Sequence, residues 1–210
     1  MIHLHNLKLL AQKGKYQTLY AVMLVLAAWD EELAAHSQQV ALELLRFTSA
    51  DDQALVPKRS VLRDHRGDEI EWYWAGLLHD LGKIALAPEI LRKRGALTTR
   101  ERKAMRKHPA KGAALLTMMR APQVVIQGAK LHHEWWDGTG YPHGLKGSQI
   151  PLIARVLAVA DVYAALTSDR PYRHAYTSEQ AQLEIERNAG TQFDPNIVAR
   201  FFERESHVTR

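Results

Sequence analysis

The chain has 210 residues, of which 46% are hydrophobic and 24% are charged, and its formal net charge is +5. This length and composition predict one soluble globular domain with a sizeable core, and the positive charge would suit a polyanionic ligand. Cysteine is absent, which excludes disulfides, zinc–thiolate sites and a thiol nucleophile. Any metal would therefore need His, Asp and Glu ligands, a set that favours iron or manganese over structural zinc.

The first quarter of the chain has a helical composition. Residues from about 15 to 48 are rich in Ala, Leu, Glu and Gln and contain no Pro or Gly to stop a helix. Its apolar part, Leu19–Trp29, is much shorter than the roughly 20 residues of a membrane span, and no signal-peptide pattern precedes it. We therefore expect a buried or interface helix and a cytoplasmic protein. The polar residues 50–70 predict a loop.

Helix signals continue beyond that loop, in chain order. An apolar helix is predicted over Trp72–Leu81, with Gly82 placed to end it. Thr98 and Glu101 have the spacing of a capping box, and a proline directly after His108 puts this histidine at a helix N-terminus. Further helices are predicted at 122–133, 151–167, from 177 to near 190, and from 195 onward, with a glycine-rich loop over 138–147. No period-2 strand pattern occurs, so the predicted class is all-α.

Two pairs of adjacent polar residues stand next to apolar helices. His79 and Asp80 follow a run of buried character, and a buried imidazole and carboxylate need partners, of which a metal ion is the most effective. The two oxygens of Asp80 could bridge two cations. Neighbouring helical residues point about 100° apart, so His132 and His133 can serve one metal site only where their helix is ending. The glycines that follow indicate such an end. The alternative for each pair is a solvated surface position.

Four single residues complete a possible ligand set. His108 begins a helix, and Asp161 lies in an apolar helical run. Glu32 and His36 are one helical turn apart and hence on one face, although for Glu32 a solvated face beside other acidic residues is an alternative. Together these residues offer enough nitrogen and oxygen ligands for two metals. Because two bridged metals clamp a phosphate ester and make hydroxide at neutral pH, the residues indicate a phosphodiesterase.

The order of these candidate ligands and the motifs around them resemble those of a known family. The chain's metal-ligand candidates match, in order, those of the HD-superfamily phosphohydrolases: His36, His79, Asp80, His108, His132, His133 and Asp161. The run from His132 to Leu145, with its Gly140-Tyr141-Pro142, resembles the signature of the HD-GYP subfamily, and residues 160–173 and 190–195 are similar to that subfamily too. The resemblance covers about residues 30–203. It implies an HD-domain helical bundle over residues 30–205, with an N-terminal helical extension over residues 1–29.

The resemblance also implies an activity and its cofactors. Family members of this kind are bacterial hydrolases that cut cyclic di-GMP to pGpG, and to GMP by a second cut, by attack of metal-activated hydroxide at an iron or manganese centre. Members with three metals resemble this chain in having a glutamate one turn before the first histidine, so Glu32 becomes a candidate ligand of a third ion. Asp80 would be the central catalytic carboxylate.

Roles outside the metal ligands follow from the same resemblance. Lys83 matches a lysine that contacts the scissile phosphate and would stabilise charge on its oxygens. Tyr141 and Pro142, after Gly140, would shape the pocket wall beside a guanine, and the basic residues Arg170 and Arg173 would bind substrate.

Other readings of the sequence stay open. The domain could bind a cyclic dinucleotide without turning it over, or it could hydrolyse another substrate, 3′,3′-cyclic GMP-AMP or a nucleotide monoester. Ala164, where the subfamily often has aspartate, and Arg173 are the residues that could change this preference. Regulation would come through a protein partner or through a homodimer formed by the N-terminal helix. We expect neither DNA binding nor membrane insertion.

Overall fold

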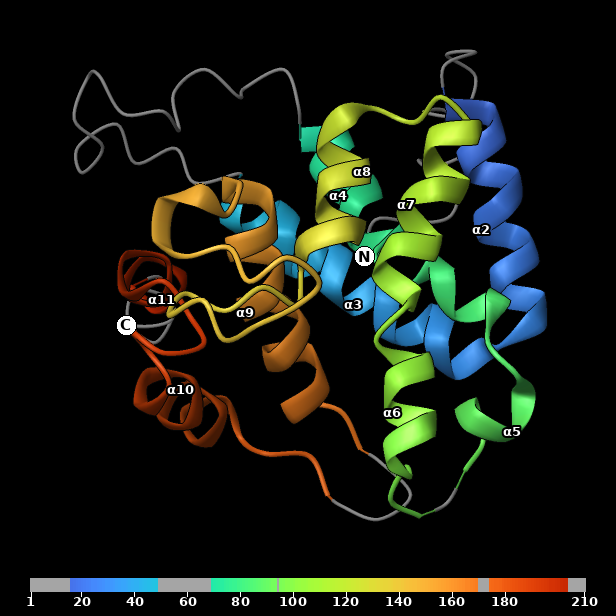
Figure 1. Cartoon of the computed structure of the whole chain (residues 1–210). Helices are drawn as coiled ribbons and strands as arrows, with labels where there is room; N and C mark the ends of the chain where they lie inside the picture. Colours follow the sequence, from blue (N-terminus) through green and yellow to red (C-terminus); the bar gives the residue numbers. More distant parts are fainter. Residues whose placement is uncertain (1–15, 49–68, 94, 170–173, 204–210) are drawn as a thin grey trace.

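The computed structural model describes residues 16–48, 69–93, 95–169 and 174–203, and it is all-α over these residues (Figure 1). Within them β-structure is limited to one isolated bridge between Ala189 and Phe193. The predicted fold class is therefore confirmed. The helices are α2 (Gln17–Trp29), α3 (Glu31–Thr48), α4 (Glu69–Leu78), the 3-10 helix η3 (Leu81–Ala85), α5 (Pro88–Leu91), α6 (Thr99–Met105), α7 (His108–Met118), α8 (Gln123–Leu131), the 3-10 helix η4 (Gly147–Gln149), α9 (Leu152–Leu166), α10 (Ser178–Arg187) and α11 (Pro195–Phe202).

The prediction of an unbroken helix over residues 15–48 is wrong, because the helix is interrupted at one residue. Asp30 has an extended backbone (φ −152°, ψ 98°) and separates α2 from α3. Its Oδ1 accepts a hydrogen bond of 2.9 Å from the backbone N–H of Leu33. A carboxylate that caps free N–H groups in this way stabilises a new helix start, and neither Pro nor Gly is needed to break the chain. The break places Glu32 and His36 in the first two turns of α3.

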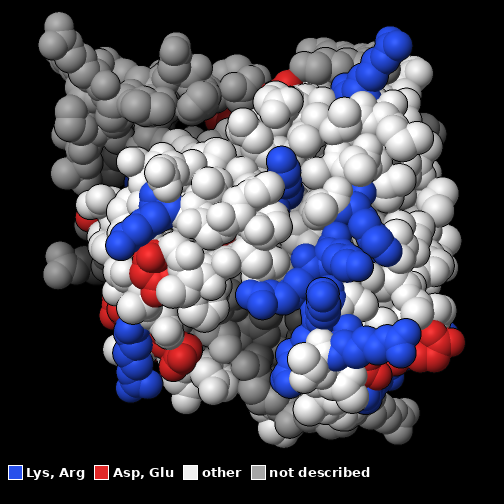
Figure 2. Space-filling model, in the orientation of Figure 1, with Lys and Arg blue, Asp and Glu red and all other residues white. Residues whose placement is uncertain are grey.

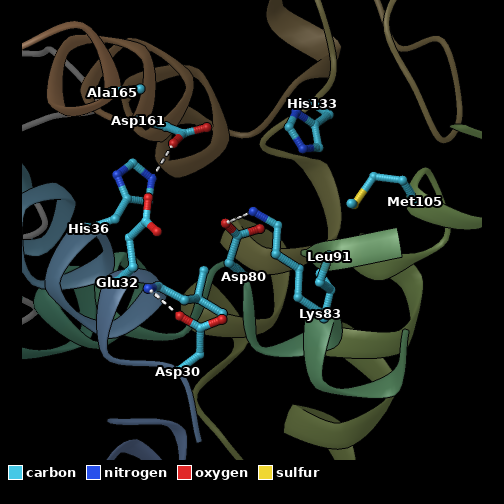
Figure 3. A pocket seen from close by; sticks show the side chains of 11 residues that line it. Asp30, Glu32, His36, Asp80, Lys83, Leu91, Met105, His133, Asp161 and Ala165 are labelled. Carbon is cyan, nitrogen blue, oxygen red and sulfur yellow. Dashed lines mark hydrogen bonds and ion pairs between the residues drawn. The ribbon is translucent and has the colours of Figure 1, made fainter. Parts of the chain in front are cut away.

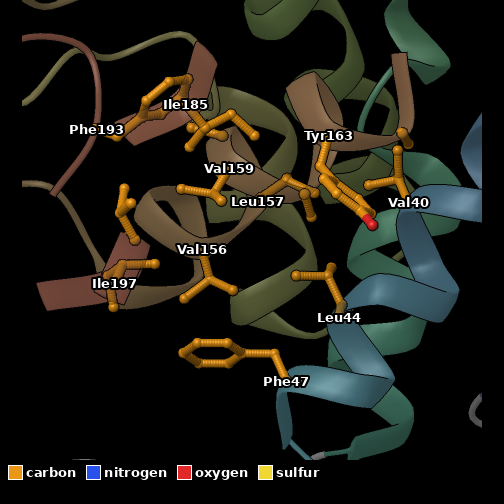
Figure 4. Close-up of a cluster of buried hydrophobic side chains, with 14 of the residues drawn as sticks. Val40, Leu44, Phe47, Val156, Leu157, Val159, Tyr163, Ile185, Phe193 and Ile197 are labelled. Atoms are coloured by element: carbon orange, nitrogen blue, oxygen red, sulfur yellow. The ribbon is translucent and has the colours of Figure 1, made fainter. Parts of the chain in front are cut away.

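Helix α4 lies at the centre of the molecule. Seven of its residues, from Trp72 to Leu78, are buried on all sides, as expected of a helix without a polar face. On one side, α4 packs with α2, α7 and α8 in a cluster that includes Trp74 and Leu19. On the other side, a second cluster joins α3 and α4 to α9, α10 and α11 (Figure 4). This frame fixes the C-terminal end of α4, where His79 and Asp80 follow.

The predicted starts of α6, α7 and α10 agree with the structure. The helix predicted over Trp72–Leu81 instead runs from Glu69 to Leu78, and Gly82 does not end it but lies in the following 3-10 helix. Thr98 and Glu101 form a capping box at α6, Thr177 and Gln180 form another at α10, and α7 begins at His108. The short helices η3 and α5 were not predicted. Gly82, in η3, allows the start of α7 to come close, because a Cβ at this position would lie 1.9 Å from the carbonyl oxygen of His108. None of the helices described is long and apolar enough to span a membrane.

Candidate metal centre

The predicted metal ligands converge from five helices and the turns at their ends. The end of α4 supplies one pair, the start of α7 and the end of α8 supply three histidines, and α3 and α9 supply one residue each from their faces. Figure 3 shows four of these residues, His36, Asp80, His133 and Asp161. The residues brought together are His36, His79, Asp80, His108, His132, His133 and Asp161. Ligands that are distant in sequence meet because each stands at, or faces, the same end of the α4-centred bundle.

The first group of ligands lies between α3, α4 and α9. One ligand atom each of His36, His79 and Asp161 lie within 4.8 Å of one another. His36 Nε2 is 2.8 Å from Asp161 Oδ1, and His79 Nε2 is 3.8 Å from the same oxygen. Two imidazoles around one carboxylate oxygen match the nitrogen and oxygen ligands that iron and manganese accept.

The second group consists of His108, His132 and His133, again with ligand atoms within 4.8 Å. The Nε2 atoms of His108 and His132 face each other at 3.3 Å. Because α8 ends at Leu131, the two adjacent histidines need not point about 100° apart as they would within a helix. Their ring centroids lie 4.1 Å apart. The expected helix end is confirmed, and it brings both histidines into one cluster of ligand atoms.

Asp80 stands between the two groups. Its Oδ2 is 3.2 Å from His79 Nε2, while its Oδ1 is 3.1 Å from His108 Nε2 and 3.9 Å from His132 Nε2. The carboxylate therefore directs one oxygen to each group, which is the geometry that a bridging ligand needs. Lys83 Nζ lies 2.5 Å from Asp80 Oδ2, so a cationic side chain also reaches this centre.

Backbone carbonyls fix the orientation of three of these rings. The Nδ1–H groups of His79 and His108 donate to the carbonyls of Gly76 and Met105, each at 2.8 Å, and that of His132 donates to Ala129 at 3.0 Å. Since a carbonyl only accepts, each neutral ring keeps Nε2 unprotonated and directed into the centre. His79 Nε2 is buried and makes no hydrogen bond within the described residues. Opposed lone pairs in a buried site need a cation, so the residues fit a metal.

Electrostatics favour the metal-binding protonation state at three of the ligands. Burial, followed by the proximity of His133, holds the pKa of His132 well below its ordinary value, and burial, with His108, lowers the pKa of His133 to about 4. Burial alone would raise the pKa of Asp80, but Lys83 and His79 outweigh it and hold that pKa well below the usual range. His132 and His133 are thus neutral beside an ionised Asp80 at neutral pH. At His79 burial alone would lower the pKa, but the nearby carboxylates of Asp80 and Asp161 outweigh it and raise that pKa, so this imidazole binds a metal in competition with a proton.

A pocket of about 290 Å³ opens onto the first group and the bridging aspartate. Glu32 lines it one turn before His36, and Lys83 and His133 line it from the other side (Figure 3). The spacing argument for Glu32 therefore puts its side chain at the site, on the exposed side of the pocket. Ala164, by contrast, is buried in the hydrophobic core, and its neighbour Ala165 lines the pocket.

The loop after α8 forms a wall beside the second group. Tyr141 stacks on His133 with 4.7 Å between ring centroids, and its backbone N–H donates to the carbonyl of His133 at 3.0 Å. Only glycine fits at Gly140, since a Cβ there would lie 2.2 Å from the backbone nitrogen of Trp135. Pro142 follows as an exposed residue. All three residues were predicted to lie in the site, and the loop brings Tyr141 against the predicted metal ligand His133.

Glu134 anchors the loop, a role that was not predicted from the sequence. It is 2% exposed, and its carboxylate accepts hydrogen bonds from the backbone N–H groups of His143 at 2.7 Å and Leu145 at 2.9 Å. A buried carboxylate with two backbone donors ties the far part of the loop to the metal ligands beside it. The available signal was an acidic residue directly after the histidine pair. Arg170 and Arg173 lie outside the described residues.

Comparisons with known proteins agree with this geometry. A family model described as HD domain matches residues 33–197. The chain belongs to the HD domain family. The predicted resemblance to HD-GYP proteins is confirmed, and the all-α architecture agrees with it.

Three relatives show the range within the family. The chain is 40% identical over 141 residues to a cyclic di-GMP phosphodiesterase of Thermotoga maritima, which is 66% of this chain and 38% of that protein. It is 47% identical over 126 residues to the cyclic di-GMP phosphodiesterase response regulator RpfG of Xanthomonas campestris, covering 59% and 33%. It is 34% identical over 200 residues to 3′3′-cGAMP-specific phosphodiesterase 2 of Vibrio cholerae, covering 94% and 36%. The chain spans about a third of the length of these relatives.

Solved structures share the fold at low sequence identity. Bd1817, an HDGYP protein from Bdellovibrio bacteriovorus, superposes with a TM-score of 0.59 at 16% identity, covering 83% of this chain and 52% of that one. The cyclic GMP-AMP-specific phosphodiesterase V-cGAP3 of Vibrio cholerae gives a TM-score of 0.59 at 18% identity, covering 82% and 44%. These likenesses establish the HD-domain fold of this chain.

Proposed function

We propose that this HD domain hydrolyses a phosphodiester bond of cyclic di-GMP, giving pGpG and, by a second cut, GMP. The observation that carries the proposal is Asp80, whose two oxygens face two separate groups of metal-ligand side chains. The names of relatives such as the Thermotoga maritima cyclic di-GMP phosphodiesterase support the substrate. The experiment that tests it is turnover of cyclic di-GMP by the metal-loaded protein, with the products identified by chromatography.

The centre would hold two divalent cations, and we propose iron or manganese because all the ligands are imidazole and carboxylate. His36, His79 and Asp161 would hold one ion, and the three histidines of the second group would hold the other, with Asp80 shared. When bound, such ions polarise a phosphoryl oxygen and supply hydroxide at neutral pH.

The remaining residues of the site would bind and orient the substrate. Lys83 is in position to donate to a phosphoryl oxygen, because its ammonium already reaches the carboxylate at the centre of the site. Tyr141, carried to the centre by Gly140 and followed by Pro142, offers a ring wall for a guanine base. We include Arg170 and Arg173 as substrate-binding residues on their sequence match alone.

Replacing Lys83 with alanine should lower kcat more than it raises KM. The ammonium contact to phosphate tightens as negative charge builds in the transition state, and removal of one such preorganised donor typically costs about 10²–10³-fold in kcat. Steady-state kinetics with cyclic di-GMP measure this split, and Lys103→Ala on the exposed face of α6 is the matched control. A purely KM effect, or loss of metal from Lys83→Ala, would show that the residue has another role.

Glu32 would be a ligand of a third ion. It lines the pocket one turn before His36, at the end of the site opposite the second group of histidines. Elemental analysis of anaerobically purified protein should give three metals per chain in the wild type and two in Glu32→Ala. Gln38→Ala, an exposed position on the same helix, is the control. Equal metal content in wild type and Glu32→Ala would rule out this role.

A second candidate substrate is 3′,3′-cyclic GMP-AMP. The relative named as specific for it aligns with 94% of this chain at 34% identity, a longer alignment than that with the Thermotoga protein. Turnover of the two cyclic dinucleotides in competition gives the ratio of their kcat/KM values and decides between them. A receptor without turnover is less well supported, because seven of the predicted ligands converge.

Location and assembly complete the proposal. We propose a cytoplasmic signalling enzyme controlled by a protein partner or by a homodimer through its N-terminal helix, a segment of which residues 1–15 lie outside the described residues. Of the described part, Leu19 and Leu26 are buried, whereas Leu24 and Val25 are exposed.

A further inference from the structure

Basic residues are concentrated in one stretch of the chain. Residues 92–111 contain nine of the 28 Lys and Arg residues and only one of the 23 acidic ones. The basic side chains gather on the surface over α6 and the start of α7 (Figure 2). The net charge of this stretch, nine positive charges less one negative, exceeds the +5 of the whole chain. The positive field is therefore local and lies beside the metal centre.

Arg106 differs from its basic neighbours in what it contacts. Its guanidinium lies 4.4 Å from the centroid of the Tyr141 ring, and that ring stacks on His133 with 4.7 Å between centroids and 24° between planes. Elsewhere in the stretch, Lys93 pairs with Glu101 and Lys111 donates to the carbonyl of Ala85. Arg106 makes no ion pair within the described parts of the chain. Its guanidinium therefore adds a positive charge to the wall that the loop forms beside the second group of ligands.

The environment of Arg106 fixes its position and leaves its donors available. It is the C-cap of α6, two residues before His108, so the helix start that places a metal ligand also places this side chain. A guanidinium that lies over an aromatic ring uses its face for that contact, while the N–H groups around its edge still point outward. A planar fork of this kind suits a pair of phosphate oxygens.

The chemistry of the proposed substrate supplies such a group. A cyclic dinucleotide has two phosphodiesters, each with one negative charge, on opposite sides of its ring. Only one of them can be at the metal centre beside Lys83, and the other must be accommodated elsewhere in the site. We propose that Arg106 binds the second, uncut phosphodiester and so selects cyclic dinucleotides over simple phosphodiesters. This proposal rests on the function proposed above.

The test compares ligands that have one and two phosphodiesters. The metal-loaded protein is assayed with bis(p-nitrophenyl) phosphate, and cyclic di-GMP and cyclic di-AMP are added as competitors. Arg106→Ala should raise the inhibition constants of both competitors about tenfold or more, the usual effect of losing a charge-assisted hydrogen bond. The KM for bis(p-nitrophenyl) phosphate and the metal content should stay near the wild-type values. The inhibition constants of Arg106→Lys should fall between those of the wild type and those of Arg106→Ala.

The exposed Arg102 on the same helix provides the matched control, and Arg102→Ala should leave both inhibition constants unchanged. If Arg102→Ala raised the inhibition constants as much as Arg106→Ala does, the effect would be one of overall charge, and the proposed contact of Arg106 would be wrong. A rise for cyclic di-GMP alone would assign Arg106 to the guanine edge, and no rise for either competitor would remove it from the site. If the wild type neither cleaves cyclic di-GMP nor is inhibited by it, the proposed function itself fails.

Discussion

Asp80→Ala is expected to abolish hydrolysis of cyclic di-GMP and to remove most of the bound metal while the protein remains helical. The carboxylate reaches His79 with one oxygen and His108 with the other, so its loss affects both ion positions at once. Two cations held close together without a shared anion repel each other, and buried imidazoles alone do not compensate for that repulsion. Elemental analysis, circular dichroism and the turnover assay on the same preparation measure the three outcomes.

Asp80→Asn is the informative companion, because it keeps the size of the side chain and removes the charge. We expect it to lose activity as Asp80→Ala does and to retain at most part of the metal, since an amide presents only one oxygen ligand. The exposed Asp169→Ala is a control outside the centre. If Asp80→Ala kept activity within a few fold of the wild type, the assignment of the metal centre would be wrong.

Gly82→Ala should have the second largest effect, and it acts through packing. A Cβ at this position would lie 1.9 Å from the carbonyl oxygen of His108 and 2.5 Å from the backbone nitrogen of Gly112. Both atoms belong to the backbone of α7, which cannot move aside as a side chain can. We expect a loss of about 2–4 kcal/mol in the free energy of unfolding, the upper part of the range for overpacking, with weaker metal binding as His108 shifts.

Gly95→Ala is the matched control for this substitution. A Cβ on Gly95 meets nothing within 4 Å, so the same chemical change is expected to leave stability and metal content unaltered. Denaturant unfolding of the metal-free proteins separates the packing effect from metal binding. Similar unfolding midpoints for the wild type and Gly82→Ala would contradict the close approach of η3 and α7.

Much of the site could be predicted because its ligands occupy recognisable positions on helices. His108 before a proline marks a helix start, and the glycines after the histidine pair mark the end of α8. These signals are local, since they depend on caps and on residues that stop a helix. Asp161 was predicted from an apolar run that packs in the core as expected.

Other features depend on contacts that no local pattern encodes. The break at Asp30 arises because one carboxylate caps α3, which outweighs the helical preference of the surrounding residues. Glu134 gains its role only when the loop folds back onto its carboxylate. Arg106 looks like one more exposed cation in a basic stretch until Tyr141 is brought over α6. Each of these residues acquires its function from a partner that is placed by tertiary structure.

The most direct test of the account is a metal titration of the stripped protein. Wild-type protein is treated with a chelator under anaerobic conditions, and Fe²⁺ or Mn²⁺ is then added in steps while bound metal and turnover of cyclic di-GMP are measured together. The bridged centre predicts no turnover without metal and full turnover only after at least two ions per chain have bound. Turnover in the stripped protein, full activity at one ion per chain, or no cleavage of cyclic di-GMP at full loading would contradict it.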